Sequence, residues 1–416
     1  MHKLNFLNPE IITEISKNFP TPLYVYSENE ILKAISNFKS VPFEFDYQIR
    51  YAMKANSNIN ILKIFKNNWV FIDASSEYEV LRALNAWFLP HEIQLSTQEM
   101  WEHLKEFLDA WVFVVATSLN QLKLIWELSP NAEIWVRINP WVWSGAFKAI
   151  ATWWLTSSFW IWHEYIAEIL KLEKKYNLKI SKIHLHIGSE NTPESWVNTA
   201  NIGLDFVNIF KNCTCLDMWW GFKMAIMPEE KTADLNAIFA KVNEKFKDFY
   251  TKTGRKIKLE VEPGKYMVIN SCSVLTKVVD VVSTWDDWYN FVKINSWMTQ
   301  MPRVTMYWVQ QPIIAINNSK NTKKYVVVGH CCESGDILTT KLYDQETIEE
   351  VELSEVNIWD ILVFEWTWAY NSSMCMKNYN SFPEVWEVMI LKNWEIKEIR
   401  KVEKINEIWR NEIEVI

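Results

Sequence analysis

The sequence contains very little glycine. Only 8 of its 416 residues are glycine, whereas ordinary proteins contain roughly 7%. Tryptophan shows the opposite departure, with 25 residues. The composition is therefore not that of an ordinary protein. The low glycine count and the high tryptophan count together indicate that many tryptophans stand where glycine is expected.

The positions of the tryptophans support this interpretation. Tryptophan occurs within polar, turn-like segments at 140–145, 152–155, 217–221 and 365–368. An indole side chain does not easily adopt a positive φ, and paired indoles in polar loops have no packing purpose that we can identify. We therefore hypothesise that many of these residues are glycine in the cell, because some bacterial lineages read the codon UGA as glycine. A tryptophan-rich protein is the alternative, which UGG codons at Trp219 and Trp220 would establish.

Membrane and secretion features are missing as well. No segment approaches the roughly 18 apolar residues of a membrane span, and residues 1–20 contain no apolar core of a signal peptide. Six cysteines in so long a chain predict reduced thiols in the cytoplasm. Cys213 and Cys215 lack a second pair at zinc-ligand spacing, so we expect no metal site. The net charge of −8 disfavours nucleic acid and membrane surfaces as partners.

The residues that are present predict a folded, two-domain α/β protein. Hydrophobic residues make up 49% of the chain, whose length exceeds what one core usually supports. Eight β-rich segments alternate with helical patterns, which predicts a (β/α)8 barrel of the TIM type over residues 30–285. The expected strands are Arg50–Met53, Val70–Asp73, Ile93–Leu95, Val112–Ala116, Ile134–Ile138, Ile183–Ile187, Cys215–Met218 and Ile257–Val261. The expected helices include Glu77–Asn85, Thr97–Leu108, His163–Tyr176, Pro193–Phe210 and Thr232–Thr253.

The rest of the chain has the pattern of an antiparallel β domain. Beyond about residue 265 we expect no further helices. The expected strands are Tyr266–Thr284, Tyr289–Asn295, Ile313–Asn317, Lys324–Gly329, Asp360–Phe364 and Val385–Leu391. Residues 286–416, together with an N-terminal arm of residues 1–29, should form a β-sandwich or β-barrel-like domain.

Polar residues gather where the expected barrel strands end, which is where such barrels place their active sites. Lys54 follows the first strand. Burial at a barrel mouth would lower the pKa of a lysine and favour the neutral amine that Schiff-base chemistry needs. A lysine that extends to solvent is the alternative, and it would be preferred if Lys54 stood alone.

Three further strand ends accompany Lys54. His186 precedes Gly188 and Ser189, a small residue and a hydroxyl that suit close approach to a phosphate. Residues 219–221, read as three glycines, would form an anion-binding loop of backbone N–H groups. Glu262 is a carboxylate placed to hold a ring nitrogen protonated, which makes pyridoxal 5'-phosphate (PLP) an electron sink. A lone His186 would more often be a core histidine.

These motifs resemble those of the alanine-racemase-fold (type III) PLP-dependent decarboxylases. The shared segments follow the same order over nearly the whole chain: Tyr51–Asn58, His186–Ser189, Asp217–Phe222, Glu262–Lys265 and Cys332–Asp336. Within that family the chain looks most like the diaminopimelate decarboxylases, which catalyse the last step of lysine biosynthesis. The discriminating segments are Arg303–Tyr307, Cys332–Asp336, Ala369–Met374 and Asn378–Asn380.

The resemblance implies a role for each site residue. Lys54 would hold the cofactor covalently, His186 would stack on its ring and Glu262 would contact the ring nitrogen. The other expected cofactor contacts are Ser189, Trp220, Gly221, Pro263, Gly264, Lys265 and Tyr370. Lys265 replaces the arginine that usually follows this Glu-Pro-Gly motif, which keeps the charge and loses the bidentate fork.

The resemblance also implies a substrate site shared between the two subunits of a homodimer. Cys332 would donate a proton from the partner subunit, and Glu333 would bind the distal ammonium of the substrate. Arg303 and Tyr307 would bind its distal carboxylate. Lys265 and Tyr370 complete the expected substrate contacts.

Two alternatives remain open at this stage. A decarboxylase of the same fold could act on carboxynorspermidine, ornithine or arginine, although ornithine has no distal carboxylate and would leave Arg303 unpaired. A non-catalytic, PLP-free regulatory homologue belongs to a different functional class. The presence of Lys54, His186, Glu262 and Cys332 disfavours it, and tryptophan at positions 219 and 220 would favour it.

Overall fold

A computed structural model describes residues 2–99, 102–140, 158–186, 192–219, 221–285, 288–298, 300–342, 344–367 and 369–416. Their contacts separate two compact units. The barrel unit comprises residues 34–224 and 231–267, and the antiparallel unit comprises residues 1–33, 225–230 and 268–416. In the described part of the chain, none of the helices has the length and apolar character that a membrane crossing requires.

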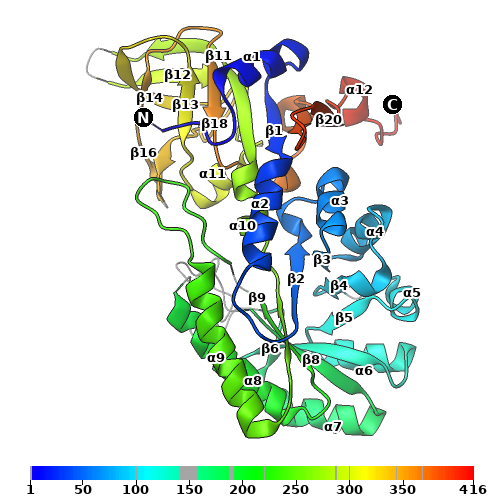
Figure 1. Cartoon of the computed structure of the whole chain (residues 1–416). Helices are drawn as coiled ribbons and strands as arrows, with labels where there is room; N and C mark the ends of the chain where they lie inside the picture. Colours follow the sequence, from blue (N-terminus) through cyan, green and yellow to red (C-terminus); the bar gives the residue numbers. More distant parts are fainter. Residues whose placement is uncertain are drawn as a thin grey trace. The chain divides into compact units, whose positions relative to one another are not determined.

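The barrel unit is built on eight parallel strands that close on themselves. Their order is β2-β3-β4-β5-β6-β8-β9-β10, and β10 pairs with β2 again (Figure 1). This closure confirms the predicted TIM-type barrel. The strands are β2 Tyr47–Ala52, β3 Phe71–Ala74, β4 Ile93–Ser96, β5 Phe113–Ala116, β6 Glu133–Asn139, β8 Lys179–His186, β9 Cys215–Trp219 and β10 Lys258–Val261.

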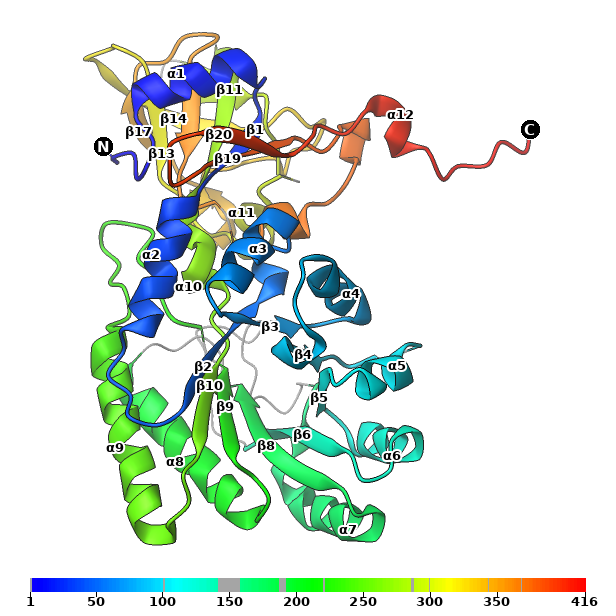
Figure 2. The same ribbon diagram turned by 45° about the vertical axis from the view of Figure 1, so that its right-hand side comes forward.

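Helices alternate with these strands and lie outside them (Figure 2). They are α2 Glu28–Lys39, which spans the unit boundary, α3 Ile59–Asn67, α4 Glu77–Asn85, α5 Leu104–Asp109, α6 Leu119–Leu128, α7 Ile166–Tyr176, α8 Pro193–Ile209, α9 Leu235–Thr253 and α10 Lys265–Val268. Side-chain caps start several of them, because the hydroxyl or carboxylate satisfies an N–H that has no partner within the helix. Ser76, Ser118, Thr192 and Asp234 cap α4, α6, α8 and α9 in this way.

One barrel helix begins later than the sequence predicted. The pattern favoured a helix from Thr97, whereas α5 starts at Leu104. The carbonyl oxygen of Thr97 instead accepts hydrogen bonds from the Gln121 amide at 3.0 Å and the Thr117 hydroxyl at 3.1 Å. These contacts with the next strand–helix connection hold the start of the segment outside a helix.

The antiparallel unit contains a sheet ordered β17-β14-β12-β11-β1-β19-β20, to which β13 and β18 are joined at β11. Its first strand, β1 (Leu23–Ser27), runs antiparallel to β11 and parallel to β19. The strands are β11 Cys272–Ser283, β12 Asn290–Ile294, β13 Ile313–Ile316, β14 Thr322–Val328, β15 Thr340–Lys341, β16 Asp344–Ile348, β17 Val351–Ser354, β18 Ile361–Phe364, β19 Trp386–Ile390 and β20 Ile396–Arg400. Its core includes Ile12 and Ile15 of α1 (Pro9–Asn18) and strand residues Leu23, Val363 and Val388.

Two predictions for this half of the chain were wrong. The strand expected from Tyr266 begins only at Cys272, because residues 265–268 form α10 and residues 269–271 a 3-10 turn. Short apolar runs do not distinguish a strand from a buried helical turn by periodicity. Helices also persist beyond residue 265, as α11 (Pro302–Tyr307) and α12 (Ile405–Ile408). Pro302 at the start of α11 suits the first turn of a helix.

Candidate functional site in the barrel

Lys54 lies just beyond the carboxyl end of β2, in the 3-10 turn of residues 53–55. Its ammonium nitrogen is 4.1 Å from the centroid of the Trp219 ring. Burial lowers the pKa of Lys54, the carboxylate of Asp73 opposes this shift, and the guanidinium of Arg137 adds to it. The lowered pKa increases the fraction of neutral amine, which is the nucleophilic form.

His186 ends β8 and pairs in register with Trp219 at the end of β9. The two rings stack with centroids 3.4 Å apart and an angle of 24° between their planes. Burial lowers the pKa of His186 well below its usual range, and the charges of Arg137 and Lys54 lower it further. The imidazole is therefore neutral near pH 7, which suits stacking against an aromatic ring.

Glu262 follows β10 and is buried among other polar side chains. Its carboxyl group accepts a hydrogen bond from the Gln94 amide, and its second oxygen lies 3.6 Å from Nε2 of His184. Burial raises the pKa of Glu262 well above its usual range, and the carboxyl groups of Asp217 and Asp73 raise it further. A cationic group facing Glu262 would favour the carboxylate form.

A layer of paired charges fills the barrel interior next to these residues. Nζ of Lys182 lies 2.6 Å from an Oε2 of Glu260 and also contacts Asp217. Arg50 Nε lies 2.6 Å from the same Glu260 oxygen. The two cations hold the pKa of Glu260 well below its usual range even though burial raises it. This pairing makes four buried charged side chains tolerable inside the barrel.

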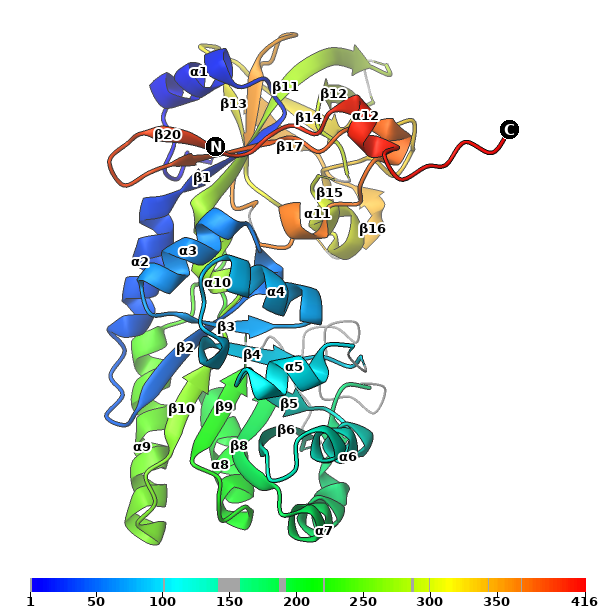
Figure 3. The same cartoon turned by 90° about the vertical axis from the view of Figure 1, so that its right-hand side faces the viewer.

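The sequence analysis overlooked this layer. Residues at alternate positions of a strand point to the same side, so Lys182 and His184 share a face with His186. The register continues the row across the sheet, where His184 pairs with Asp217 and Asp217 with Glu260. The strands concerned, β8, β9 and β10, lie side by side in Figure 3. The sequence contained one indication of this layer, because ionisable residues occur at every second position of strands that were expected to be buried.

The expected substrate residues of the antiparallel unit fall into two groups. Arg303 in α11 lies with its guanidinium carbon 5.7 Å from the Tyr370 ring centroid. The backbone N–H of Arg303 also donates to the Asn371 side chain at 3.5 Å. Tyr307 is half-buried at the last position of α11, four residues after Arg303. The structure thus brings Arg303 and Tyr370 together, and Tyr307 lies on the same short helix.

Cys332 and Glu333 lie in the loop after β14 and are exposed. The N–H of Cys332 donates to the Asn380 side chain at 3.2 Å, and the Tyr379 hydroxyl donates to Glu333 at 3.4 Å. Asn380 and Tyr379 belong to the segment that the family resemblance had already singled out. Two segments distant in the sequence therefore meet around this thiol and carboxylate.

Asp336 fixes this loop, a role that the sequence did not reveal. Its buried carboxylate accepts hydrogen bonds from the N–H groups of Met298 at 2.7 Å and Cys331 at 2.9 Å. Gly329 allows the close approach, because a Cβ at that position would lie 2.2 Å from an Asp336 oxygen. Glycine is therefore required at this place by packing.

The remaining predicted cofactor contacts are only partly described. Pro263 and Gly264 are buried after β10, and Lys265 is half-buried at the first position of α10. Gly221 is exposed after β9. Ser189 and Trp220 lie outside the described residues.

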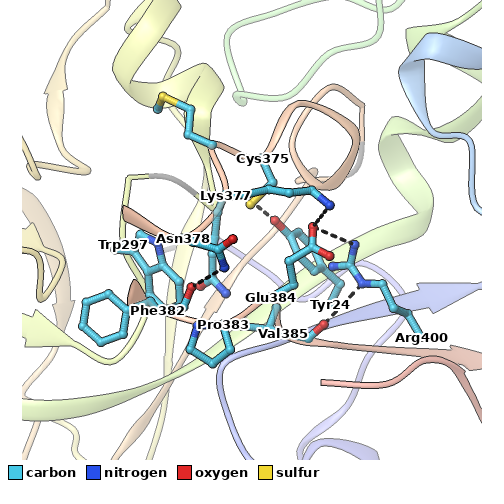
Figure 4. A pocket seen from close by; sticks show the side chains of 12 residues that line it. Tyr24, Trp297, Cys375, Lys377, Asn378, Phe382, Pro383, Glu384, Val385 and Arg400 are labelled. Atoms are coloured by element: carbon cyan, nitrogen blue, oxygen red, sulfur yellow. Dashed lines mark hydrogen bonds and ion pairs between the residues drawn. The ribbon is translucent and has the colours of Figure 1, made fainter. Parts of the chain in front are cut away.

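The antiparallel unit also contains a small pocket, shown in Figure 4. Its polar groups bind one another, since Lys377 pairs with Glu384 at 3.0 Å and Arg400 donates to the Val385 carbonyl at 3.3 Å. Its lining contains none of the predicted site residues. These features favour a structural role for the pocket.

The barrel residues fit PLP in their chemistry, with one exception. An amine at Lys54, a neutral ring at His186 and a buried acid at Glu262 match the aldehyde, the ring and the ring nitrogen of that cofactor. The Trp219 indole, however, stacks on His186 and lies under Lys54. A cofactor ring joined to Lys54 and stacked on His186 would need the same space, so the site with this indole does not fit PLP.

Comparisons with known proteins identify relatives along the whole chain. Residues 28–269, more than half of the chain, match the family model described as "Pyridoxal-dependent decarboxylase, pyridoxal binding domain". The diaminopimelate decarboxylase of Buchnera aphidicola subsp. Acyrthosiphon pisum is 32% identical over 415 residues, which cover 97% of each chain. The Escherichia coli K12 enzyme of the same name is 26% identical over 97% of this chain and 96% of its own.

Solved structures show the same likeness. A crystal structure of a diaminopimelate decarboxylase superposes with a TM-score of 0.90 at 26% identity, covering 98% of this chain and 99% of its own. The Helicobacter pylori enzyme complexed with L-lysine gives a TM-score of 0.85 at 26% identity and covers 96% and 98%. By sequence and by fold, the chain belongs to the diaminopimelate decarboxylase family of pyridoxal-dependent decarboxylases.

Proposed function

We propose that this chain decarboxylates meso-2,6-diaminopimelate to L-lysine with PLP as its cofactor, the last step of lysine biosynthesis. The observation that carries the proposal is that Lys54 and His186 contact the same Trp219 ring, and that the Glu262 carboxyl after β10 lies close enough to Lys54 to raise the pKa of this lysine. The names of the relatives, which align over 97% of the chain, support the same substrate. We also propose a cytoplasmic location and domain boundaries at 30–285 and 286–416, with the arm 1–29 joining the second domain.

The barrel residues would hold the cofactor. When bound, PLP supplies an electron sink for the electrons that remain when CO2 leaves. The Lys54 amine would hold it, the His186 ring would support one face, and Glu262 would face the ring nitrogen. Further contacts are proposed for Ser189, Trp220, Gly221, Pro263, Gly264, Lys265 and Tyr370, with Trp220 read as glycine.

The antiparallel unit would supply the substrate contacts. Arg303 and Tyr307 would bind the distal carboxylate, and Glu333 the distal ammonium. Tyr370, which lies beside Arg303, and Lys265 would complete the substrate site. The Cys332 thiol would give its proton to the α-carbon after CO2 has left.

We further propose that the working protein is a homodimer. Cys332 and Glu333 are exposed in this chain, which suits side chains that complete a site in the partner subunit. Burial at such an interface would exclude water from the thiol and from the reacting carbon.

Substrate assays test the proposal. The enzyme should release CO2 and L-lysine from meso-diaminopimelate, because that substrate alone offers both a distal carboxylate and a distal ammonium to the oppositely charged Arg303 and Glu333. Turnover of only carboxynorspermidine, ornithine or arginine would contradict it. A substrate without the carboxylate leaves Arg303 without its partner, and such a mismatch can lower kcat/KM by about 10⁴-fold.

One observation favours a second candidate, a PLP-free regulatory homologue. The Trp219 indole fills the space that the cofactor ring needs, and a protein with that side chain would not load PLP. Addition of PLP to the purified protein distinguishes the two candidates. A visible absorbance band from the lysine-bound cofactor supports the enzyme, whereas its absence from native protein supports the regulatory homologue.

A further inference from the structure

Seven tryptophans among the described residues have a left-handed backbone. Their φ angles lie between 49° and 80°. They are Trp69, Trp87, Trp111, Trp308, Trp359, Trp366 and Trp394. A residue with a Cβ is strained in this region, and a bulky side chain makes the conformation a true outlier, whereas glycine adopts it freely.

Three of the seven occupy the same place in the same motif. Trp69 follows α3, and its N–H donates to the Lys66 carbonyl at 3.1 Å while the N–H of Val70 donates to the Phe65 carbonyl at 3.1 Å. This pair of bonds defines a Schellman motif with Trp69 at the left-handed C′ position, which is usually glycine.

The ends of α4 and α5 repeat this geometry. Trp87 donates to Leu84 at 2.9 Å, and the next N–H donates to the Ala83 carbonyl at 3.2 Å. Trp111 donates to Leu108 at 3.1 Å, and its successor donates to the Phe107 carbonyl at 2.9 Å. Three successive barrel helices therefore end in a motif whose key position is tryptophan.

The end of α9 shows what these helix ends require. There the left-handed residue is Gly254, with a φ of 70°, and its N–H donates to the Tyr250 carbonyl at 2.8 Å. A left-handed residue thus ends α9 as glycine and α7 as Asn177, with a φ of 50°, whereas the left-handed residue is tryptophan at three other helix ends. Glycine and asparagine are the usual residues at such positions. The helix ends therefore share a left-handed backbone and differ in the residue at that position.

The indoles at these positions gain little from packing. Trp69, Trp87 and Trp111 are 76%, 70% and 77% exposed. Trp359 and Trp394 are also exposed. Trp359 is the third residue of the turn that Asp360 closes on Asn357, a position with φ of 80° that in such turns is usually glycine. Burial therefore offsets none of the backbone strain at these five positions.

Trp219 gives an independent reason of a different kind. Its indole occupies the space between Lys54 and His186, so the disagreement between the site and its cofactor comes from this side chain. Loss of the indole would open that space while β9 keeps its backbone pairing with β8 and β10. This part of the inference rests on the proposed function, whereas the left-handed positions do not.

We infer that glycine stands at positions 69, 87, 111, 359, 394 and 219 in the protein that the cell makes. The left-handed backbone supports glycine at the first five positions. The space that the cofactor ring needs supports glycine at position 219. Each of these codons is then UGA, decoded as glycine. Glycine at position 219 would leave the space between Lys54 and His186 open for the cofactor ring.

Trp196 is the matched control within the same chain. It lies inside α8 with helical backbone, is fully buried, and stacks on Phe222 with centroids 4.6 Å apart. Glycine there would leave a cavity in the core and weaken the helix. We therefore assign Trp196 as a true tryptophan encoded by UGG.

Mass spectrometry of the native protein tests these assignments. The protein is purified from the cells that carry the gene and is digested with trypsin. The cleavage sites isolate peptide 67–82 with position 69, peptide 212–223 with position 219, and peptide 183–211 with Trp196. The first should have the mass expected for glycine at 69, and the third the mass expected for tryptophan. The second also contains position 220, so its fragment masses should show glycine at 219. Tryptophan at 69 overturns the decoding inference, and tryptophan at 219 alone overturns it for the cofactor site.

Recombinant variants separate this inference from the proposed function. Trp69→Gly should raise the melting temperature, whereas Trp69→Ala, which also removes the indole but keeps a Cβ, should raise it less; equal gains would contradict the backbone argument. The double variant Trp219→Gly/Trp220→Gly should gain a PLP absorbance band that the parent lacks. If native peptides carry glycine at 219 and this variant still binds no PLP, the decoding inference stands and the proposed function fails.

Discussion

The predicted site residues of the barrel unit and those of the antiparallel unit are held very differently. His186 and Glu262 are buried at the ends of strands in one closed sheet, where neighbouring charges shift their pKa values. Cys332 and Glu333 are exposed in a loop, with side-chain contacts of 3.2 Å and 3.4 Å to the segment around Asn380. The fold of a single chain therefore determines the surroundings of His186 and Glu262, whereas Cys332 and Glu333 remain exposed to solvent in that chain.

This difference indicates a division of work. A cofactor must be held in a fixed position, and a closed barrel with paired interior charges provides rigid positions. In the proposed homodimer, the Cys332 thiol and the Glu333 carboxylate would act only when the substrate is present, so a surface that the partner subunit covers would suit them. The predictions below test whether the two groups differ in this way.

Loss of Lys54 should have the largest effect. We expect Lys54→Ala to abolish decarboxylation and the absorbance band of lysine-bound PLP, in a background with glycine at positions 219 and 220. Lys63→Ala is the matched control, since Lys63 lies on the helix α3 and not at the end of a barrel strand. A Lys54→Ala protein that keeps the band would contradict the assignment.

Loss of Cys332 should have the next largest effect. Cys332→Ala should lower kcat by about 10²–10⁴-fold, the usual contribution of a general acid, with PLP still bound. Mixing this variant with Lys54→Ala should restore part of the activity, because a mixed dimer contains one site with both groups if Cys332 acts across the interface. Absence of recovery in verified mixed dimers would place the two groups in the same subunit.

Disruption of the charged layer should reduce stability rather than chemistry. Lys182→Met removes the cation that contacts the buried Asp217 carboxylate, while Glu260 keeps Arg50 as a partner. We therefore expect a loss of about 3–5 kcal/mol in the free energy of unfolding. Lys179→Met is the control on the same strand, because its exposed contact with Glu133 at 3.1 Å is worth about 1 kcal/mol or less. Equal losses in urea unfolding would show that the interior layer is not special.

A smaller effect should appear as a pH dependence. Burial raises the pKa of Asp73 to about 7, with the Lys54 ammonium opposing the shift and Asp217 adding to it. An acid with a raised folded pKa stabilises the fold fully below its unfolded pKa, and this contribution is lost as the pH rises through the folded pKa. Asp73→Asn should therefore gain stability relative to the parent between about pH 4 and about pH 7 in urea unfolding. A constant difference across that range would contradict this.

The sequence predicted the barrel well because the relevant information is local. Eight apolar segments of strand length, each followed by a helical pattern, specify the alternation, and the carboxyl ends then place Lys54, His186 and Glu262 on one rim. The boundary at Tyr266 failed because a short apolar run suits a strand and a buried helical turn equally, whereas the boundary at Thr97 failed for a nonlocal reason. The Gln121 amide, from the next helix along the chain, donates a hydrogen bond to the Thr97 carbonyl. The residue pattern around Thr97 contains no sign of that contact.

The pairings within the charged layer and the anchoring role of Asp336 could not be predicted from the sequence. Lys182, Asp217 and Glu260 come from three different strands, and their pairing follows from the register of the closed sheet. Asp336 likewise anchors its loop by accepting hydrogen bonds from the N–H groups of Met298 and Cys331. The partner of a buried charge is often distant in the sequence and near only in the folded structure. The sequence therefore shows that burial of the charge is unfavourable, but it does not show which residue offsets this.

The scarcity of glycine was visible in the sequence, whereas its structural consequences were visible only in the fold. By itself the sequence established that tryptophan is too frequent, that it occurs in turn-like segments, and that the family motifs follow in order. Only the tertiary structure separated a left-handed helix end at Trp69 from the helical core position of Trp196, and showed the Trp219 indole against His186. The physical reason is that φ is set by the hydrogen bonds that close each helix or turn, and free space is set by the residues packed around it.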